Sequence, residues 1–177
     1  NISTKYTFPF FSEFNIENKF SIFFSYKYFF KELSSAIRVD FEFEVGIVNM
    51  RRKYTLDSVQ EAGETPLHII PITLMFHLNF FHRFGYISPY IGAGMGTSII
   101  NQTVGDYEKT SLTFSLMAGI NFLTKWPVSF HIEIRYTWFG MAKLVSEGIT
   151  SGDDITISQR EEKQLRGFLF TIGLVVR

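Results

Sequence analysis

Ionisable side chains alternate with apolar ones in two stretches of the sequence. The residues at every second position are Arg38, Asp40, Glu42 and Glu44 in one stretch and Ser129, His131, Glu133 and Arg135 in the other. Alternate residues of a β-strand share one face, so each set should line a single face of its strand. Charges that are buried together must be paired. We therefore expect Arg135 to reach across to Glu42 or Glu44.

Two functions are compatible with this charge network. In the first, the ion pairs form a plug that fixes the strand register and has no other role. In the second, the network is a gate or a proton-linked pore. We favour the plug. Truncation of Arg135 that left both thermal stability and conductance unchanged would contradict both interpretations.

A run of glycines raises the question of a nucleotide site. The stretch ISPYIGAGMGTSII, residues 87–100, contains Gly92, Gly94 and Gly96. A dinucleotide-binding fingerprint has the spacing G-x-G-x-x-G at a strand-to-helix turn. Here the spacing is G-x-G-x-G and no amphipathic helix follows, so the glycines should line one face of a strand. We interpret them as an interior strip that leaves space for Arg135 to cross the inside of the molecule.

The elements that would position these residues are all β-strands. Strict alternation of apolar with small or polar residues predicts eight strands and no helix. They span residues 4–14, 20–28, 36–49, 70–79, 87–100, 111–122, 128–139 and 167–176. Each is long enough for the roughly 9–11 residues of a tilted membrane strand. No linker or change of composition divides the chain, so we expect one domain over residues 1–177.

The balance of large and small side chains decides which face points inward. Aromatic residues make up 18% of the chain, with 21 Phe. An eight-stranded barrel has an interior just wide enough for modest side chains, so it cannot hold this many bulky ones. The apolar faces should therefore point outward into lipid. The predicted fold is an all-β, membrane-spanning, eight-stranded antiparallel up-and-down barrel.

Two soluble folds are the alternatives. A lipocalin-like barrel would point the apolar face inward around a ligand, but it would then expose residues such as Gly92 and Ser115 to water. A β-sandwich would bury both apolar faces, but its outer faces should then be rich in Lys and Glu. Only residues 36–49 and 128–139 have such a face. The sequence therefore favours the lipid-facing barrel.

The remaining composition excludes several classes of function. The chain has no cysteine, which rules out disulfides and thiolate metal sites. Its net charge is zero, which argues against nucleic acid as a partner. We expect no metal and no cofactor. The carboxylates of Asp153 and Asp154 lie in residues 145–163, which we interpret as a solvated loop and a contact surface rather than a Ca²⁺ site.

Connection lengths predict an orientation. The second, fourth and sixth connections are short, whereas the third, fifth and seventh are longer. Outer-membrane barrels have short periplasmic turns and longer external loops, so both termini should be periplasmic. Aromatic residues gather at the periplasmic rim, as in a membrane-interface girdle. They are Phe29, Phe30, Phe80, Phe81, Phe84, Tyr86 and Trp126.

The stretch SPYIGAGMG, residues 88–96, follows a short turn and resembles a strand of the small bacterial outer-membrane barrels, the OmpW, OmpX and opacity-protein group. This resemblance implies a bacterial outer-membrane protein with lipid as its surroundings and other envelope proteins as possible loop partners. The chain begins at Asn1 without an initiator Met, which we interpret as a processed mature chain. It ends on LVVR, whereas members of the group usually end on an aromatic residue.

Three functions follow from the resemblance. We favour a non-enzymatic structural or surface-interaction protein that acts through its loops. The alternative is a narrow conduit for small hydrophobic molecules, as the likeness to OmpW implies, with Pro71 and Pro89 loosening the wall because proline donates no ladder hydrogen bond. For the two prolines themselves we favour a bulge with no transport role. The third is a lipid-modifying enzyme. Lipid A deacylases use Ser, His and Glu on the lipid-facing wall, whereas the row from Ser129 to Glu133 should face inward.

Overall fold

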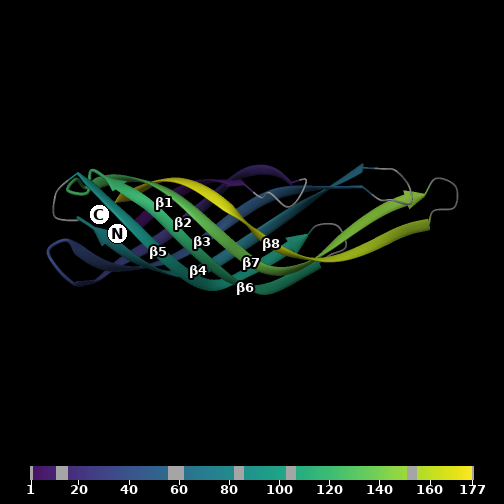
Figure 1. Cartoon of the computed structure of the whole chain (residues 1–177). Helices are drawn as coiled ribbons and strands as arrows, with labels where there is room; N and C mark the ends of the chain where they lie inside the picture. The colour runs from purple at the N-terminus through teal and green to yellow at the C-terminus, as the bar shows by residue number, and fades with distance from the viewer. Residues whose placement is uncertain are drawn as a thin grey trace.

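The computed structural model is a closed antiparallel barrel (Figure 1) and describes residues 2–10, 16–55, 62–81, 86–102, 107–150 and 155–176. Its strands are β1 (Ile2–Phe10), β2 (Ile16–Glu32), β3 (Ile37–Thr55), β4 (Ala62–Phe80), β5 (Ile87–Gln102), β6 (Tyr107–Phe122), β7 (Val128–Thr150) and β8 (Ile155–Val176). Each strand pairs with the next in the chain, and β8 pairs with β1. The predicted fold class is confirmed. Among the described residues no helix has the length and hydropathy needed to span a membrane.

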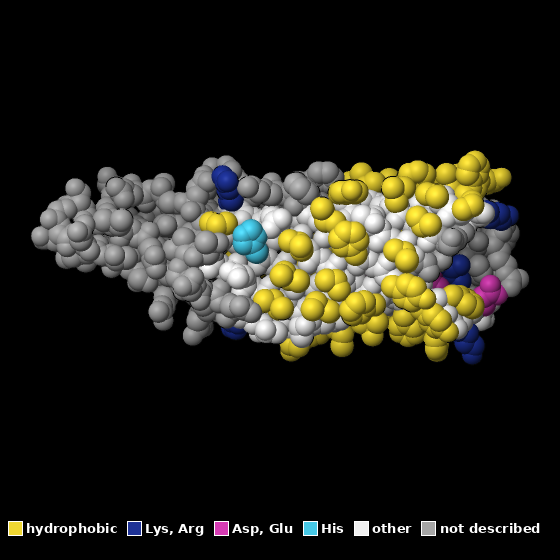
Figure 2. Space-filling view, turned by 180° about the vertical axis from the view of Figure 1, so that it is seen from behind, with side chains coloured by type: hydrophobic (Ala, Val, Ile, Leu, Met, Phe, Trp, Pro, Cys, Tyr) yellow, Lys and Arg dark blue, Asp and Glu magenta, His cyan; other side chains and the backbone are white. Residues whose placement is uncertain are grey.

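Apolar side chains cover the outside of the barrel. Phe114, Ile132 and Leu174 are 44%, 42% and 42% exposed, whereas Ser115 beside Phe114 is 4% exposed. Figure 2 shows hydrophobic side chains spread over the wall, with charged side chains at its rim. The soluble lipocalin-like alternative requires the opposite arrangement and is therefore wrong. Because every strand carries this outward apolar face, the surface matches a lipid environment rather than water.

The apolar wall ends abruptly on β4 and β5. Ile70 lies opposite Ile99, and the next outward-facing pair is His68 opposite Asn101. His68 Nδ1 is 2.7 Å from Oδ1 of Asn49 on β3, so a polar row begins where the apolar rows stop. From Ile70 to the end of β4, ten steps of about 3.3 Å at a tilt of about 40° span roughly 25 Å along the barrel axis. This height equals the apolar band of an outer-membrane barrel.

Both termini and the turns that follow β2, β4 and β6 lie at one end of the barrel (Figure 1). We call this the turn end. Its aromatic side chains are exposed as a lipid interface requires. The exposed fractions are 51% for Phe29, 58% for Phe30, 54% for Phe81, 63% for Tyr86 and 56% for Trp126. Five of the seven predicted aromatic residues are therefore exposed, whereas Phe80 is half-buried and Phe84 lies outside the described residues.

At the opposite end the β3–β4 and β7–β8 hairpins are longer than the sequence pattern predicts. The segment 145–163, predicted as a loop, is strand up to Thr150 and again from Ile155. Its pairing partner is the other arm of the hairpin, and this cross-strand pairing does not require apolar alternation. Asp153 and Asp154 lie outside the described residues. We call the paired segments Gly140–Thr150 and Ile155–Leu165 the β7–β8 ribbon.

Candidate functional site in the barrel interior

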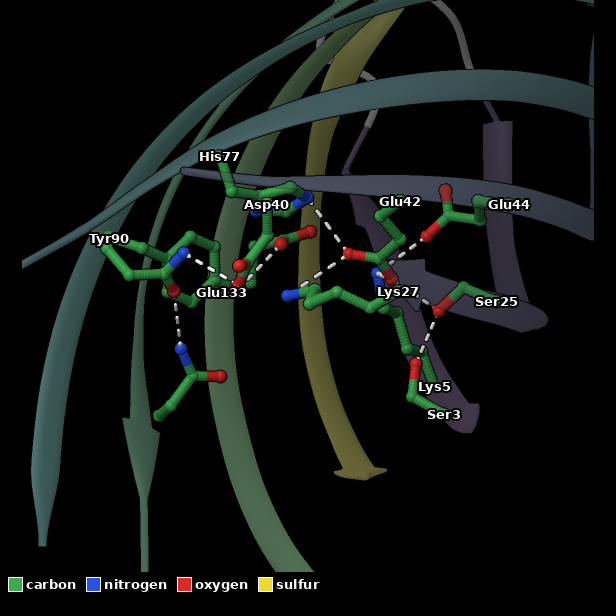
Figure 3. A network of polar contacts seen from close by, with 12 residues as sticks. Ser3, Lys5, Ser25, Lys27, Asp40, Glu42, Glu44, His77, Tyr90 and Glu133 are labelled. Carbon is green, nitrogen blue, oxygen red and sulfur yellow. Dashed lines mark hydrogen bonds and ion pairs between the residues drawn. The ribbon is translucent and has the colours of Figure 1, made fainter. Parts of the chain in front are cut away.

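Charged and polar side chains from six strands meet inside the barrel near the turn end (Figure 3). We call this set the ionic layer. Its members are Lys5, Lys27, Glu42, Glu44, His77, Tyr90, Glu133 and Arg135. All are buried except Lys27, which is 12% exposed. The inward-facing phase of each strand places them there, because alternate positions on the same strands carry the outward apolar residues.

Arg135 of β7 joins the two sides of the ionic layer. Its Nη2 donates to Glu44 Oε2 at 3.0 Å, and its Nη1 hydrogen-bonds the other oxygen of the same carboxylate. Its Nε donates to Glu133 at 2.9 Å. The guanidinium therefore bridges two carboxylates, one of them held in the bidentate geometry that suits arginine. The predicted contact with Glu44 is present.

Glu42 is the centre of the second half of the layer. Its Oε1 lies 2.6 Å from Lys5 Nζ, and its Oε2 lies 3.3 Å from Lys27 Nζ and 2.9 Å from His77 Nε2. Lys5 also contacts Glu44 at 2.7 Å, so the first strand is tied to β3 and the two halves are connected. Three cations thus face three carboxylates. A buried cluster requires such a balance, since an unpaired charge is costly at low dielectric.

Arg38 and Asp40, also predicted to join the interior network, form a smaller group nearer the turn end. Arg38 Nη2 donates to Asp40 Oδ2 at 2.8 Å, and Asn79 Nδ2 donates to the same oxygen at 3.0 Å. Arg38 is 27% exposed, whereas Asp40 is buried. This pair therefore lies at the mouth of the barrel, where water reaches the arginine.

Inward-facing glycines leave space for large side chains on neighbouring strands. Each of five glycines lies opposite a ring or a thioether that covers it. The pairs are Gly46 with Phe23, Gly92 with Met117, Gly94 with Met75, Gly119 with Tyr90, and Gly173 with His131. A Cβ at position 119 would lie 2.6 Å from the Tyr90 ring. This arrangement resembles the aromatic covering of glycine that stabilises strand pairs.

The space beside the glycines of the predicted interior strip is occupied by groups on the neighbouring strands. Gly92 and Gly94 admit Met117 and Met75, and Gly96 lies against the backbone of β4 at Ile72. Arg135 extends over the ring of Phe23, with its Cζ 5.6 Å from the ring centroid, and Met117 lies between it and Gly92 in the strand register. The space that a missing side chain leaves is filled by the nearest group on a neighbouring strand.

A second interior layer was not predicted. Beyond Phe23 the inward side chains become apolar and form a buried cluster that we call the apolar layer. It comprises Phe23, Val48, Met50, Leu67, Ile69, Ile100, Phe139, Leu165 and Leu169. The signal in the sequence is the change on β3 from Glu42 and Glu44 to Val48 and Met50 at the same inward phase. The barrel is thus filled by ion pairs towards the turn end and by hydrocarbon towards the other end.

The wall between β3 and β4 is interrupted beside this apolar layer. Pairing runs to Val48 opposite Ile69 and resumes at Val45 opposite Ile72. The residues skipped on β4 are Ile70 and Pro71. Proline has no backbone N–H and cannot donate to the ladder. The interruption thus coincides with Pro71, and the register is the same on both sides of it, whereas Pro89 remains paired opposite Ile120.

The comparison with protein families is decisive for the class. The family described as "Outer membrane protein beta-barrel domain" matches residues 2–177. The chain belongs to this family. Among curated proteins none matches the sequence.

Solved structures agree on the fold of this outer-membrane barrel. Neisserial surface protein A is similar with a TM-score of 0.61 at 14% identity, over 99% of this chain and 94% of that one. The outer membrane enzyme PagL is similar with a TM-score of 0.55 at 12% identity, over 97% of each chain. At these identities the likeness establishes the fold, and function must be argued from the site.

The side chains of Ser129, His131 and Glu133 are all buried inside the barrel rather than placed on its lipid-facing wall. Ser129 and His131 are each 2% exposed and face the interior. Glu133 accepts hydrogen bonds from Tyr90 at 2.7 Å and from Arg135, so its carboxylate orients these two residues. His131 Nε2 has no hydrogen-bond partner among the described residues. A hydrolase needs its base within hydrogen-bond reach of the nucleophile and of an orienting group. The described residues also contain no group of three potential metal ligands.

Proposed function

We propose that this chain is a single-domain, non-enzymatic outer-membrane barrel with a sealed interior, and that it acts as a structural or surface-contact protein through the end opposite its termini. Both termini are then periplasmic, and the contact surface includes Asp153 and Asp154. The observation that carries the proposal is the pair of stacked layers inside the barrel. The ionic layer and the apolar layer fill successive levels, so a solute would have to disrupt both.

The sealed interior is tested by conductance. The protein inserted in a planar bilayer should conduct no ions, and Arg135→Met should not conduct either, because the apolar layer still closes the other half of the barrel. Steady channels from the unmodified protein would contradict the plug. Channels from Arg135→Met alone would instead identify the ionic layer as a gate.

The orientation is tested by cysteine labelling, for which the chain is well suited because it has no cysteine of its own. Asp153→Cys places a thiol between the arms of the β7–β8 ribbon, and Lys125→Cys places one in an exposed turn at the turn end. In intact cells a membrane-impermeant maleimide should label the first variant and leave the second unlabelled. The reverse pattern would overturn the proposed orientation.

A conduit for small hydrophobic molecules is the second candidate, and the interrupted wall at Pro71 favours it. A depression of about 270 Å³ on the outer surface lies over β2 and β3, one strand away from Pro71 and at the level of the apolar layer; it is lined by Ile22, Phe24, Val45, Gly46, Ile47 and Asn49. Pro71→Val would restore the missing ladder donor. A conduit predicts slower uptake of an apolar dye by cells carrying this variant, whereas a sealed barrel predicts no change.

An enzymatic role is tested on the lipid itself. Lipid A from cells that express the chain should have the same mass spectrum as lipid A from cells that do not. Loss of an acyl chain, abolished by Ser129→Ala or His131→Ala in a variant that still folds, would overturn the non-enzymatic proposal.

A further inference from the structure

We infer that the free edge of β7 in the β7–β8 ribbon pairs with the same edge of a second copy of this chain, antiparallel and centred on Val145. This inference rests on the proposed surface role and names the partner for it. The ribbon's position in the fold, the register of its strands and the order of charges along β7 carry the argument.

The ribbon leaves the barrel with one edge of each strand unpaired in the described part of the chain. Pairing of β6 with β7 ends at Phe114 opposite Trp138, whereas β7 and β8 remain paired as far as Thr150 opposite Ile155. The separation begins at the bulge before Gly140, whose φ of +86° favours glycine. Figure 1 shows the two strands extending past the rest of the barrel. An exposed strand edge is a template for another strand.

The sequence of β7 is complementary to itself in one register. Between Gly140 and Thr150 the charged residues are Lys143 and Glu147, four positions apart. In an antiparallel pair with two-fold symmetry, centring on Val145 places Lys143 opposite Glu147 of the second copy, twice. The same register places Met141 opposite the second copy's Ile149. Opposite charges directly across a pair of strands stabilise it, and like charges destabilise it.

Other registers and the other edge lack this match. Centring β7 on position 143 or 147 would oppose two like charges, and other centres leave both charges opposite uncharged residues. On β8, each centre that opposes unlike charges also places Glu161 or Glu162 opposite itself. A two-fold interface requires a self-complementary patch. The charge pattern therefore selects β7.

The antiparallel direction of the pairing determines whether the two copies lie in one membrane or in two. Because the ribbon continues outward from the barrel (Figure 1), antiparallel pairing brings together ribbons that point in opposite directions. Two copies in one membrane point the same way, so the paired copies belong to two facing membranes. Eleven residues at about 3.3 Å each give each ribbon a reach of roughly 36 Å. The contact would therefore join neighbouring cells or vesicles.

The test uses cells that carry the full chain in their outer membrane, in two populations labelled with different dyes. When both populations carry the unmodified chain, the mixed cells should form two-colour aggregates, which are counted by flow cytometry. Lys143→Glu and Glu147→Lys should each lower the aggregate count roughly tenfold when present in both populations. Lys143→Glu cells mixed with Glu147→Lys cells should aggregate as the unmodified cells do, since unlike charges are again opposed. The double exchange should also aggregate.

Lys163→Glu is the matched control, because it reverses a charge in the β8 arm of the same ribbon and should leave aggregation unchanged. Heat-modifiable gel migration shows that each variant is folded, and labelling of Asp153→Cys reports the orientation separately. Correctly oriented, folded protein that fails to aggregate would overturn this inference and leave the proposed function standing. Single reversals that aggregate normally, or a mixture of the two that fails to aggregate, would overturn the proposed register.

Discussion

The two interior layers close the same barrel by different physical means. The ionic layer fills its level with three cations and three carboxylates, whereas the apolar layer fills its level with nine apolar side chains. β3 contributes Glu42 and Glu44 to one layer and Val48 and Met50 to the other. Hydrocarbon packing depends mainly on volume and is non-directional, whereas each ion pair requires its specific partner. The ionic layer should therefore be less tolerant of change.

The largest expected effect is the loss of Arg135. Arg135→Met leaves Glu44 and Glu133 buried without their main cation, and breaking a buried pair from one side costs about 3–5 kcal/mol. Urea unfolding of the protein in bilayers, followed by tryptophan fluorescence, measures this cost. Adding Glu133→Gln restores equal numbers of cations and carboxylates, because Glu44 keeps its contact with Lys5 at 2.7 Å, and should recover most of the lost stability. A double variant as unstable as Arg135→Met would mean that packing around Arg135, rather than its charge, is what stabilises the layer.

The contact between Arg135 and Glu44 could be predicted because both lie on strands with unambiguous alternation. Lys5 was not assigned to the network, because Pro9 weakens the first segment as a ladder strand. Its side chain reaches Glu42 only because β1 closes the ring between β2 and β8, and alternation within a strand carries no information about ring closure. Tyr90 was missed because its ring lies over Gly119, a cross-strand relation.

The apolar layer was missed for another reason. Assigning apolar residues to the lipid side works only while the inward side is polar. Beyond Ile47 the pattern on β3 inverts, because the apolar Val48 and Met50 point inward whereas the alternate positions Asn49 and Arg51 are polar. Assigning apolar residues to the lipid side therefore gives the wrong face there. Phe23 was missed for the same reason: it is buried in the interior, but in the sequence it belongs to a run of aromatic residues on β2. The β7–β8 ribbon was missed because its outer part has no apolar alternation, although its two arms pair with each other.

The second effect tests the apolar layer. Ile69 is fully buried in it, and Ile69→Ala should cost about 2–5 kcal/mol through lost burial and a residual cavity. Ile69→Val, which keeps most of the volume, should cost about 0.5–1.5 kcal/mol. The same unfolding measurement checks both. A loss of stability that grows with the volume removed would distinguish this layer from the ionic layer, where each ion pair needs its specific partner. Equal losses for Ile69→Val and Ile69→Ala would contradict volume-dependent packing.

The third effect tests the opposed glycine pairs. A Cβ at Gly173 would overlap the ring of His131, so Gly173→Ala should cost about 1–3 kcal/mol by overpacking. In a His131→Ala background the space is free, and Gly173→Ala should then have little effect. A double-mutant cycle by urea unfolding measures the coupling between the two positions. Additive losses would mean that Gly173 is required by the local backbone rather than by the ring of His131 opposite it.

The smallest expected effect is the loss of Arg38, and it separates the contribution of burial from that of charge. The ion pair between Arg38 and Asp40 has the same chemistry as that between Arg135 and Glu44, but its arginine is 27% exposed at the mouth of the barrel. Water screens the remaining charge there, and Asn79 still donates to the carboxylate. Arg38→Met should therefore cost less than about 1 kcal/mol, and the cost should shrink further with added salt. If the unfolding measurement gave Arg38→Met a loss as large as that of Arg135→Met, burial would not be what makes the ionic layer intolerant. The contrast between the layers would then have to be explained by the connectivity of the ion pairs across the barrel.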